Sequence, residues 1–258
     1  MKALRSVRRA LRPHHHLVVR RRFVAFCVGA GKTGTTSIAR MFSSYRVAHE
    51  ADAGETIDHV LARANGRSSD RELVEFFAKR DRRLWLEFES SQILGSAIDS
   101  LAEAVPDARY ILTVREPRSW MRSTLNHLQT QPIRRGWSDY ADHRFGTQEG
   151  ASDGGTTPRI RGYSIDGYLS YWARHNRTVL DTIPPSRLLV VRTSRISERI
   201  GAIAAFVGVP VDTLDAAAAH ARRSPAYADP LTGIDPDFIE ARVEYWCGDL
   251  LDELFTET

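Results

Sequence analysis

The sequence predicts an α/β fold in which a three-layer parallel β-sheet is flanked by helices. Short apolar or β-branched runs alternate with amphipathic helical segments along the chain, a pattern typical of βαβ units. The run RYILTV at Arg109–Val114 is apolar enough to be buried on both faces, as strands of parallel sheets are. In a sheet of this kind, ligands bind at the carboxyl ends of the strands.

The first half of the chain is expected to supply four strands and four helices. Ser69 or Asp70 is a good N-cap, and it predicts where the third of these helices begins. We expect strands at Phe23–Val28, Arg46–His49, Leu84–Phe88 and Arg109–Val114, and helices at Thr35–Ser44, Glu55–Ala64, Asp70–Lys79 and Ile93–Ala104.

The second half opens with a helix at Pro117, because proline is favoured at the first helical position. The segment Thr130–Gly162 is rich in Gly, Ser, Thr and Asp, which predicts a long irregular loop. Loops of that length often cover binding sites, so we expect a flexible substrate lid at 130–162. The remaining predictions are a helix at Ile165–Asp181, a strand at Arg187–Val191, and helices at Ile196–Val207, Asp212–Arg222 and Pro236–Phe255.

Composition indicates one globular domain at 23–258, since 42% of the 258 residues are hydrophobic and 26% are charged. The preceding arm, 1–22, carries eight basic residues and no acidic residue. It could contact nucleic acid or an anionic membrane, or it could be solvated. We assign it no function and expect no nucleic-acid partner; the oligomeric state stays open.

The apolar runs and the cysteines predict a cytoplasmic protein without a metal. No run approaches the roughly 20 apolar residues that span a bilayer, so we expect no transmembrane segment. Cys27 and Cys247 have neither metal-ligand spacing nor the pattern of a disulfide framework.

The loop Gly29–Ser37 (GAGKTGTTS) joins the first predicted strand to the first predicted helix. Backbone N–H groups and the helix dipole at such a junction bind anions. The glycines allow close approach of the backbone, the lysine adds a charge, and the hydroxyls add donors. We therefore predict that a phosphorylated ligand binds to Gly31, Lys32, Thr33, Gly34, Thr35, Thr36 and Ser37.

Two common phosphate-binding motifs fit this loop less well. Gly29, Gly31 and Gly34 satisfy the dinucleotide pattern G-x-G-x-x-G, and Glu50 or Asp52 lies near the offset of a ribose-binding acid. That motif has no use for a lysine directed at phosphates. A Walker A loop requires Gly-Lys-Ser/Thr after four spacer residues, whereas the lysine here lies upstream of Gly34.

The segment GKTGTTS resembles the 5′-phosphosulfate loop of PAPS-dependent sulfotransferases, P-K-[ST]-G-T-[ST], with Gly31 where that family often has proline. The segment Arg115–Ser123 (REPRSWMRS) resembles the 3′-phosphate motif of the same family, in which a serine follows the arginine by eight positions. Residues 188–210 are similar to its late strand and FLG-type helix. The family's basic R-K-G segment has no clear match, and Arg222 and Arg223 are the candidates to replace it.

The resemblance implies a P-loop NTPase-like fold of the bacterial small-molecule type, with PAPS (3′-phosphoadenosine 5′-phosphosulfate) as donor and no metal. A sulfuryl group would pass to a hydroxyl or amine of a small acceptor, and PAP would be released. Arg115 and Ser123 would bind the 3′-phosphate, and Lys32 would stabilise charge on the bridging oxygen. Alternative functions are a nucleotide-dependent phosphotransferase and a nucleotide-binding module without catalysis.

The family often places a histidine or glutamate just after the strand that precedes the arginine-bearing strand. Here Glu87 and Glu89 occupy that place on one face of the predicted strand, where each can raise the other's pKa. We expect Glu89 to be the general base, with Glu87 as its neighbour and His127 as the next candidate. Aromatic residues that could line the acceptor pocket are Trp137, Tyr140, Phe145, Tyr163, Tyr168 and Trp172.

Overall fold

A five-stranded parallel sheet forms the centre of the computed structural model, which describes residues 20–130, 136–146, 158–220 and 229–255. The strand order is β2-β3-β1-β4-β7, and every pairing in this sheet is parallel. The strands are β1 (Ala25–Cys27), β2 (Val47–His49), β3 (Phe88–Ser90), β4 (Arg109–Val114) and β7 (Leu188–Arg192). The predicted fold class is confirmed.

Helices cover both faces of the sheet, and side chains of β4 alternate between the two cores. Ile111 packs with α3 (Thr35–Met41) and α11 (Ile200–Val207) on one face. Tyr110 and Leu112 point to the opposite core, because successive strand residues face opposite ways. Helices that contribute to that second core include α4 (Ala53–Ala64), α5 (Asp70–Leu84), α7 (Ile98–Ala104) and α10 (Ile165–Thr182).

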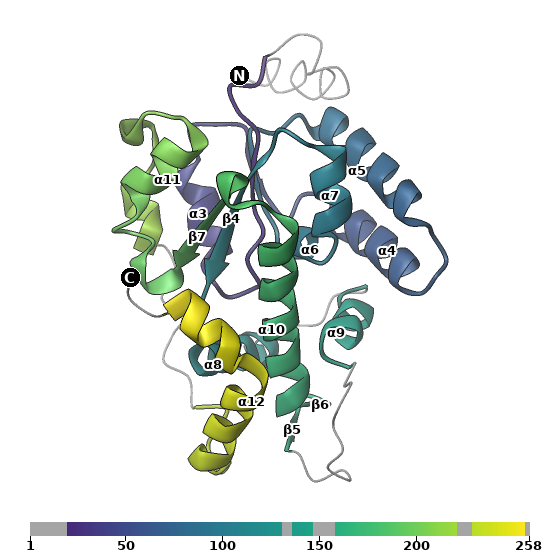
Figure 1. The fold of residues 1–258 in the computed structure, drawn as a ribbon, viewed down its shortest axis with the longest axis vertical. Helices are drawn as coiled ribbons and strands as arrows, with labels where there is room; N and C mark the ends of the chain where they lie inside the picture. Colours follow the sequence, from purple (N-terminus) through teal and green to yellow (C-terminus); the bar gives the residue numbers. More distant parts are fainter. Residues whose placement is uncertain (1–19, 131–135, 147–157, 221–228, 256–258) are drawn as a thin grey trace.

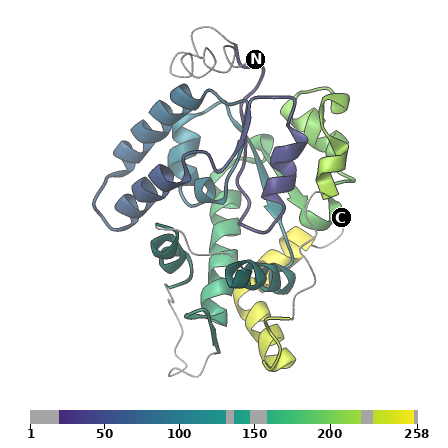
Figure 2. The same cartoon turned by 180° about the vertical axis from the view of Figure 1, so that it is seen from behind.

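A group of helices lies beyond the carboxyl ends of the strands, below the sheet in Figures 1 and 2. The lower half of α10 lies among them, so this long helix connects the sheet to the group. The group comprises α8 (Pro117–Thr130), α9 (Trp137–Phe145), α12 (Pro236–Phe255) and the hairpin of β5 (Arg159–Ile160) and β6 (Tyr163–Ser164).

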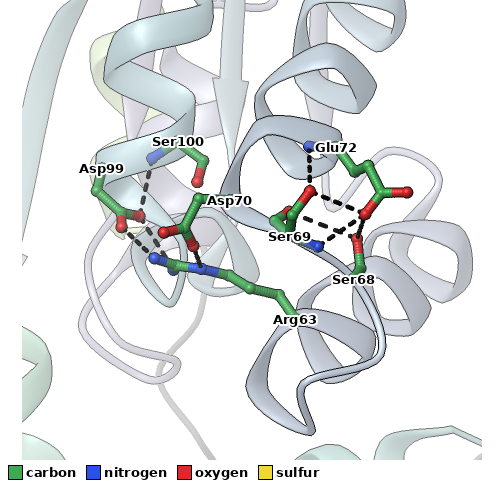
Figure 3. A network of polar contacts seen from close by, with 7 residues as sticks. All are labelled: Arg63, Ser68, Ser69, Asp70, Glu72, Asp99 and Ser100. Carbon is green, nitrogen blue, oxygen red and sulfur yellow. Dashed lines mark hydrogen bonds and ion pairs between the residues drawn. The ribbon is translucent and has the colours of Figure 1, made fainter.

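Helix α5 is longer than predicted, and this moves the following strand. A capping box between Ser69 and Glu72 begins α5 at Asp70, as expected (Figure 3). The helix continues to Leu84 and ends where Trp85 adopts a left-handed conformation with φ 49°. The strand predicted at 84–88 therefore begins only at Phe88. Figure 3 also shows Arg63 of α4 between Asp70 of α5 and Asp99 of α7.

Several helix predictions differ in detail from the structure. The helix expected at 93–104 is divided into α6 (Gln92–Gly95) and α7, and the one expected at 196–207 is preceded by the 3₁₀ turn η3 (Thr193–Arg195). The predicted 212–222 helix consists of the 3₁₀ turns η4 (Val211–Thr213) and η5 (Ala216–His220) within the described residues. A third such turn, η2 (Pro185–Arg187), precedes β7.

The irregular loop expected at 130–162 contains α9, whose Tyr140 and Phe145 are buried in the core. Residues 131–135 and 147–157 of the expected lid lie outside the described residues. So do residues 1–19 of the basic arm, whereas Arg21 and Arg22 at its end pair with Asp81 and Glu87 of the domain. Among the described residues, no helix is long and apolar enough to cross a membrane.

Candidate active site

A cavity of about 780 Å³ opens at the carboxyl ends of β1, β2 and β3. Its lining includes residues of the loop Gly29–Ser37, called the phosphate loop below, and of α8, α9 and the β5–β6 turn. The lining residues are Gly31, Lys32, Thr35, Thr36, His49, Glu50, Gln92, Trp120, Thr124, His127, Leu128, Trp137, Ala141, Arg144, Arg161 and Tyr163. Residues of the predicted phosphate loop thus line a cavity that is larger than the two others described, which measure about 10 and 610 Å³.

Two positions of the phosphate loop require glycine, Gly29 because it lies against β4 and Gly34 because of its backbone conformation. A Cβ atom on Gly29 would lie 2.1 Å from Thr113 Oγ1, and Gly34 has a φ of 100°. Lys32 also adopts a left-handed backbone, with φ 72°. Thr33 Oγ1 lies 2.6 Å from the carbonyl oxygen of Ala30 and 2.7 Å from Thr113 Oγ1. Thr33 therefore holds the shape of the loop, and its side chain faces away from the cavity.

The hydroxyls of Thr35 and Thr36 face the cavity at the start of α3, next to the end of β2. His49 Nε2 lies 3.4 Å from Thr35 Oγ1 and 3.3 Å from Thr36 Oγ1. Ser37, the last predicted hydroxyl of the loop, is buried and does not line the cavity.

Arg115 follows β4 and connects the second predicted motif to the phosphate loop. Its Nη1 donates to the carbonyl oxygen of Lys32 at 3.4 Å, and its Nε donates to Ser119 Oγ at 2.9 Å. Ser123 lies one helical turn beyond Ser119 on the same face of α8. Trp120 Nε1 donates to the carbonyl oxygen of Gly31 at 2.8 Å, so α8 is fixed against the loop. Burial lowers the pKa of the Arg115 guanidinium.

The two motifs identified from the sequence therefore meet at one edge of the sheet. A model of the sulfotransferase domain matches residues 25–217, about three quarters of the chain. The chain belongs to the sulfotransferase family. No curated protein matches the sequence.

Solved structures with a similar fold are bacterial sulfotransferases. STF9 from Mycobacterium avium has a TM-score of 0.56 and 13% identity, over 97% of this chain and 82% of STF9. A sulfotransferase from Alicyclobacillus acidocaldarius has a TM-score of 0.45 and 18% identity, over 87% of this chain and 95% of that one. The likeness to STF9 supports the P-loop-like fold of this sulfotransferase.

The structure does not bring Glu89 to the cavity of this sulfotransferase, contrary to the expectation. Because β3 begins only at Phe88, Glu89 lies in the middle of the strand, where it contacts Arg80 of α5. There it is 1% exposed and accepts two hydrogen bonds from Arg80, at 2.6 and 2.8 Å. Arg80 is itself 3% exposed, so the two form a buried ion pair.

Glu87 also lies away from the cavity, at the amino ends of the strands. Its carboxylate accepts hydrogen bonds from Arg22 Nε at 2.8 Å and from the backbone N–H of Arg46 at 3.0 Å. Burial opposes ionisation, but the hydrogen bonds from Arg22 and Arg46 outweigh it and lower the pKa of Glu87. A carboxylate held ionised in this way is a poor general base at neutral pH.

Sequence reasoning missed a polar chain that spans the cavity of the sulfotransferase. Gln92 Nε2 donates to Glu50 Oε1 at 3.0 Å, and Gln92 Oε1 accepts from Arg144 Nη1 at 2.8 Å. Glu50 directly follows β2, so its position at the carboxyl edge of the sheet could have indicated a role. Arg144 had no such signal, because α9 falls within the segment predicted as a loop.

Other predicted residues divide between the cavity and the core. His127, Trp137 and Tyr163 line the cavity. The remaining aromatic candidates are fully buried core residues: Tyr140, Phe145, Tyr168 and Trp172.

Helix α10 forms hydrogen bonds with Arg115 and with the residue that precedes the phosphate loop. Trp172 Nε1 donates to the carbonyl oxygen of Arg115 at 2.9 Å. One turn later, His175 Nε2 donates to the carbonyl oxygen of Val28 at 2.8 Å, at the point where the phosphate loop begins. Burial lowers the pKa of His175 to about 4, so its ring is neutral at pH 7.

Proposed function

We propose that this sulfotransferase transfers a sulfuryl group from PAPS to a hydroxyl or amine of a small acceptor and releases PAP. The observation that carries the proposal is the hydrogen bond between Arg115 and the carbonyl oxygen of Lys32. It joins the two motifs that resemble the 5′-phosphosulfate loop and the 3′-phosphate site. One nucleotide can therefore span both.

The donor would lie along the edge formed by β1 and β4. Arg115 and the Ser123 hydroxyl would bind the 3′-phosphate, because a guanidinium forms paired hydrogen bonds with phosphate oxygens. Lys32, Thr35, Thr36 and the first N–H groups of α3 would bind the phosphosulfate. The glycines at 31 and 34 leave the backbone accessible, while Thr33 and Ser37 would act through the loop's shape.

In the transfer, the acceptor oxygen or nitrogen forms a bond to sulfur while the bond from sulfur to the bridging phosphate oxygen breaks. The electron pair of the broken bond stays on that oxygen, which becomes part of PAP. The Lys32 ammonium would stabilise this developing charge. The acceptor's proton passes to a general base on the opposite side of the sulfur.

We propose Glu50 as that base in place of Glu87 and Glu89. Its carboxylate lines the cavity and is oriented by the amide of Gln92. His127 lines the same cavity from α8 and is the second candidate. The contact with Gln92 fixes the orientation of the Glu50 carboxylate, as a general base requires.

Labelled PAPS and a panel of alcohols, phenols and amines would test the proposal directly. We expect label transfer to at least one acceptor without added Mg²⁺, and tighter binding of PAP than of ATP. Lys32→Ala should lower kcat by about 10²-fold or more and weaken PAP binding less, because the charge it stabilises develops during transfer.

The alternatives give different results in the same assays. A nucleotide-dependent phosphotransferase would bind ATP with Mg²⁺ and show no preference for PAP. A binding module without catalysis would bind PAP but transfer label to no member of the panel.

A further inference from the structure

We propose that the acceptor carries a carboxylate in addition to its reacting hydroxyl or amine, and that Arg144 binds this carboxylate. The inference rests on the proposed sulfotransferase function and specifies the chemical class of its acceptor. It follows from how Arg144 is buried and from the charges that face it in the cavity.

Arg144 is buried without a carboxylate partner. Its side chain comes from α9, and the residue is 8% exposed while still lining the cavity. Its guanidinium contacts only neutral groups among the described residues: Nη1 donates to Gln92 Oε1 at 2.8 Å, and the Tyr171 side chain forms a further hydrogen bond with it. Its Nε is buried and has no acceptor there, but the same holds for Arg80 Nε, so the distinguishing feature of Arg144 is the missing carboxylate. Burial of an unpaired charge is costly, so such groups are retained where a ligand supplies the missing partner.

The same chain contains a buried arginine that serves structure, and its surroundings are different. Arg80 is as deeply buried as Arg144, but Glu89 contacts its Nη1 and Nη2 at 2.8 and 2.6 Å. A guanidinium that only supports packing is thus paired within the protein. Arg144 instead lies against aromatic rings, with its Cζ atom 4.7 Å from the centre of Tyr140 and 4.5 Å from that of Phe145. These rings fix the plane of the guanidinium and leave its edge for a ligand.

The charges of the cavity wall also favour an anionic acceptor. Lys32, Arg144 and Arg161 line it, whereas Glu50 is the one carboxylate among the described lining residues. The donor's phosphosulfate would occupy the neighbourhood of Lys32, which leaves two guanidinium groups and one carboxylate for the acceptor. Trp137, Leu128 and Tyr163 add an apolar surface to the same wall.

Gln92 sets the distance between the two ends of such an acceptor. Its amide contacts Glu50 on one side and Arg144 on the other, at 3.0 and 2.8 Å. An acceptor with its hydroxyl or amine at Glu50 and its carboxylate at Arg144 would lie alongside this amide. The geometry therefore fits a compact alcohol, phenol or amine that carries a carboxylate and an apolar body.

The test uses pairs of non-reacting probes that differ only in charge: 3-phenylpropanoate, 3-cyclohexylpropanoate and hexanoate, each with its neutral primary amide. Binding to the full chain is measured by calorimetry with and without PAP. In the wild type we expect the acid of at least one pair to bind about tenfold or more tighter than its amide, the range of a charged hydrogen bond. Arg144→Gln should reduce this preference to about twofold or less, and Arg144→Lys should retain part of it.

Two matched controls identify which arginine is responsible. Arg161→Gln makes the same charge change at an exposed part of the wall, and Arg118→Gln makes it outside the cavity, where Arg118 pairs with Glu240. We expect a small loss of acid preference for the first and none for the second. Equal binding of acids and amides to the wild type, or an unchanged preference in folded Arg144→Gln, would overturn the inference.

PAP binding separates this inference from the proposed function. Arg144→Gln should bind PAP as the wild type does, which also shows that the variant is folded. If the wild type binds no PAP, the proposed sulfotransfer fails whatever the acids do. If it binds PAP but no acid is preferred, only the acceptor class is wrong.

Discussion

The two deeply buried arginines Arg80 and Arg144 lie in contrasting regions of this sulfotransferase. Arg80 lies beneath α5, where a carboxylate of the neighbouring strand meets its guanidinium from within the core. Arg144 lies at the carboxyl edge of the sheet, where a neutral amide contacts it and the nearest lining carboxylate is on the far side of that amide. The charge of Arg80 is balanced within the core, whereas the carboxylate partner proposed for Arg144 would come from the acceptor.

The comparison shows that the contacts of a glutamate in this chain decide whether it is a candidate for the general base. Glu87 and Glu89 each pair with arginines away from the cavity, and the hydrogen bonds from Arg22 and Arg46 lower the pKa of Glu87. Glu50 accepts from an amide and faces the cavity. The following predictions test whether the two regions differ in function as they differ in pairing.

The largest effect is expected for Glu50→Gln. Loss of the proposed base should lower kcat by roughly 10²- to 10⁴-fold, because the acceptor's proton has no positioned carboxylate to receive it. PAP affinity and the free energy of unfolding should change little, and Glu55→Gln, at an exposed position of α4 that pairs with Arg83, is the matched control. Steady-state kinetics with labelled PAPS and PAP titration measure both quantities. If Glu50→Gln keeps a normal kcat and His127→Gln has a much lower kcat, His127 is the general base.

Glu89→Gln should act on stability instead. It leaves the Arg80 guanidinium buried without its carboxylate, which typically costs 3–5 kcal/mol. Urea denaturation would show this, with Glu75→Gln as control, since Glu75 forms only exposed ion pairs. The double variant Arg80→Met, Glu89→Leu should recover much of the loss. A Glu89→Gln protein with unchanged stability and reduced kcat would instead support Glu89 as the general base.

A moderate and selective effect is expected for Arg115→Ala. It should weaken PAP binding by about 1.5–3 kcal/mol and leave binding of adenosine 5′-phosphosulfate nearly unchanged, because only PAP has the 3′-phosphate. Arg118→Ala is the control, because Arg118 lies three residues after Arg115, at the start of α8, and pairs with Glu240 at the surface. Equal losses for both nucleotides would contradict the assignment of the 3′-phosphate site.

The smallest effect concerns pH and His175. Its folded pKa of about 4 lies below the value of about 6.5 in an unfolded chain, so the unfolded state binds more protons between those values. The contribution of His175 is present above about pH 6.5 and lost as the pH falls toward 4. At pH 5 the loss should be ~2 kcal/mol, and His175→Gln should lack it. Parallel loss in wild type and variant between pH 7 and 5 would show that other groups dominate.

The fold and the two motifs that meet at one edge of the sheet could be recognised from the sequence because their signals are local. The alternation of strands and helices, the glycines around Lys32, and the spacing of Arg115 and Ser123 are all visible in short segments. The buried position of Glu89 could not be predicted, because α5 ends five residues beyond Lys79 and β3 then begins only at Phe88. Arg144 could not be predicted either, since its role depends on contacts with Gln92 and Tyr140 that are distant in sequence or lie within an unrecognised helix.

The two hydrogen bonds from α10 to the strand ends have a consequence for the speed of nucleotide binding. Trp172 and His175 hold the carbonyl oxygens of Arg115 and Val28 from one helix, so the two segments proposed to bind the donor have a fixed spacing before any nucleotide arrives. A preorganised site of this kind loses little conformational freedom on binding. PAP should therefore associate in a single fast phase whose rate rises linearly with PAP concentration, without a slower rearrangement of the protein.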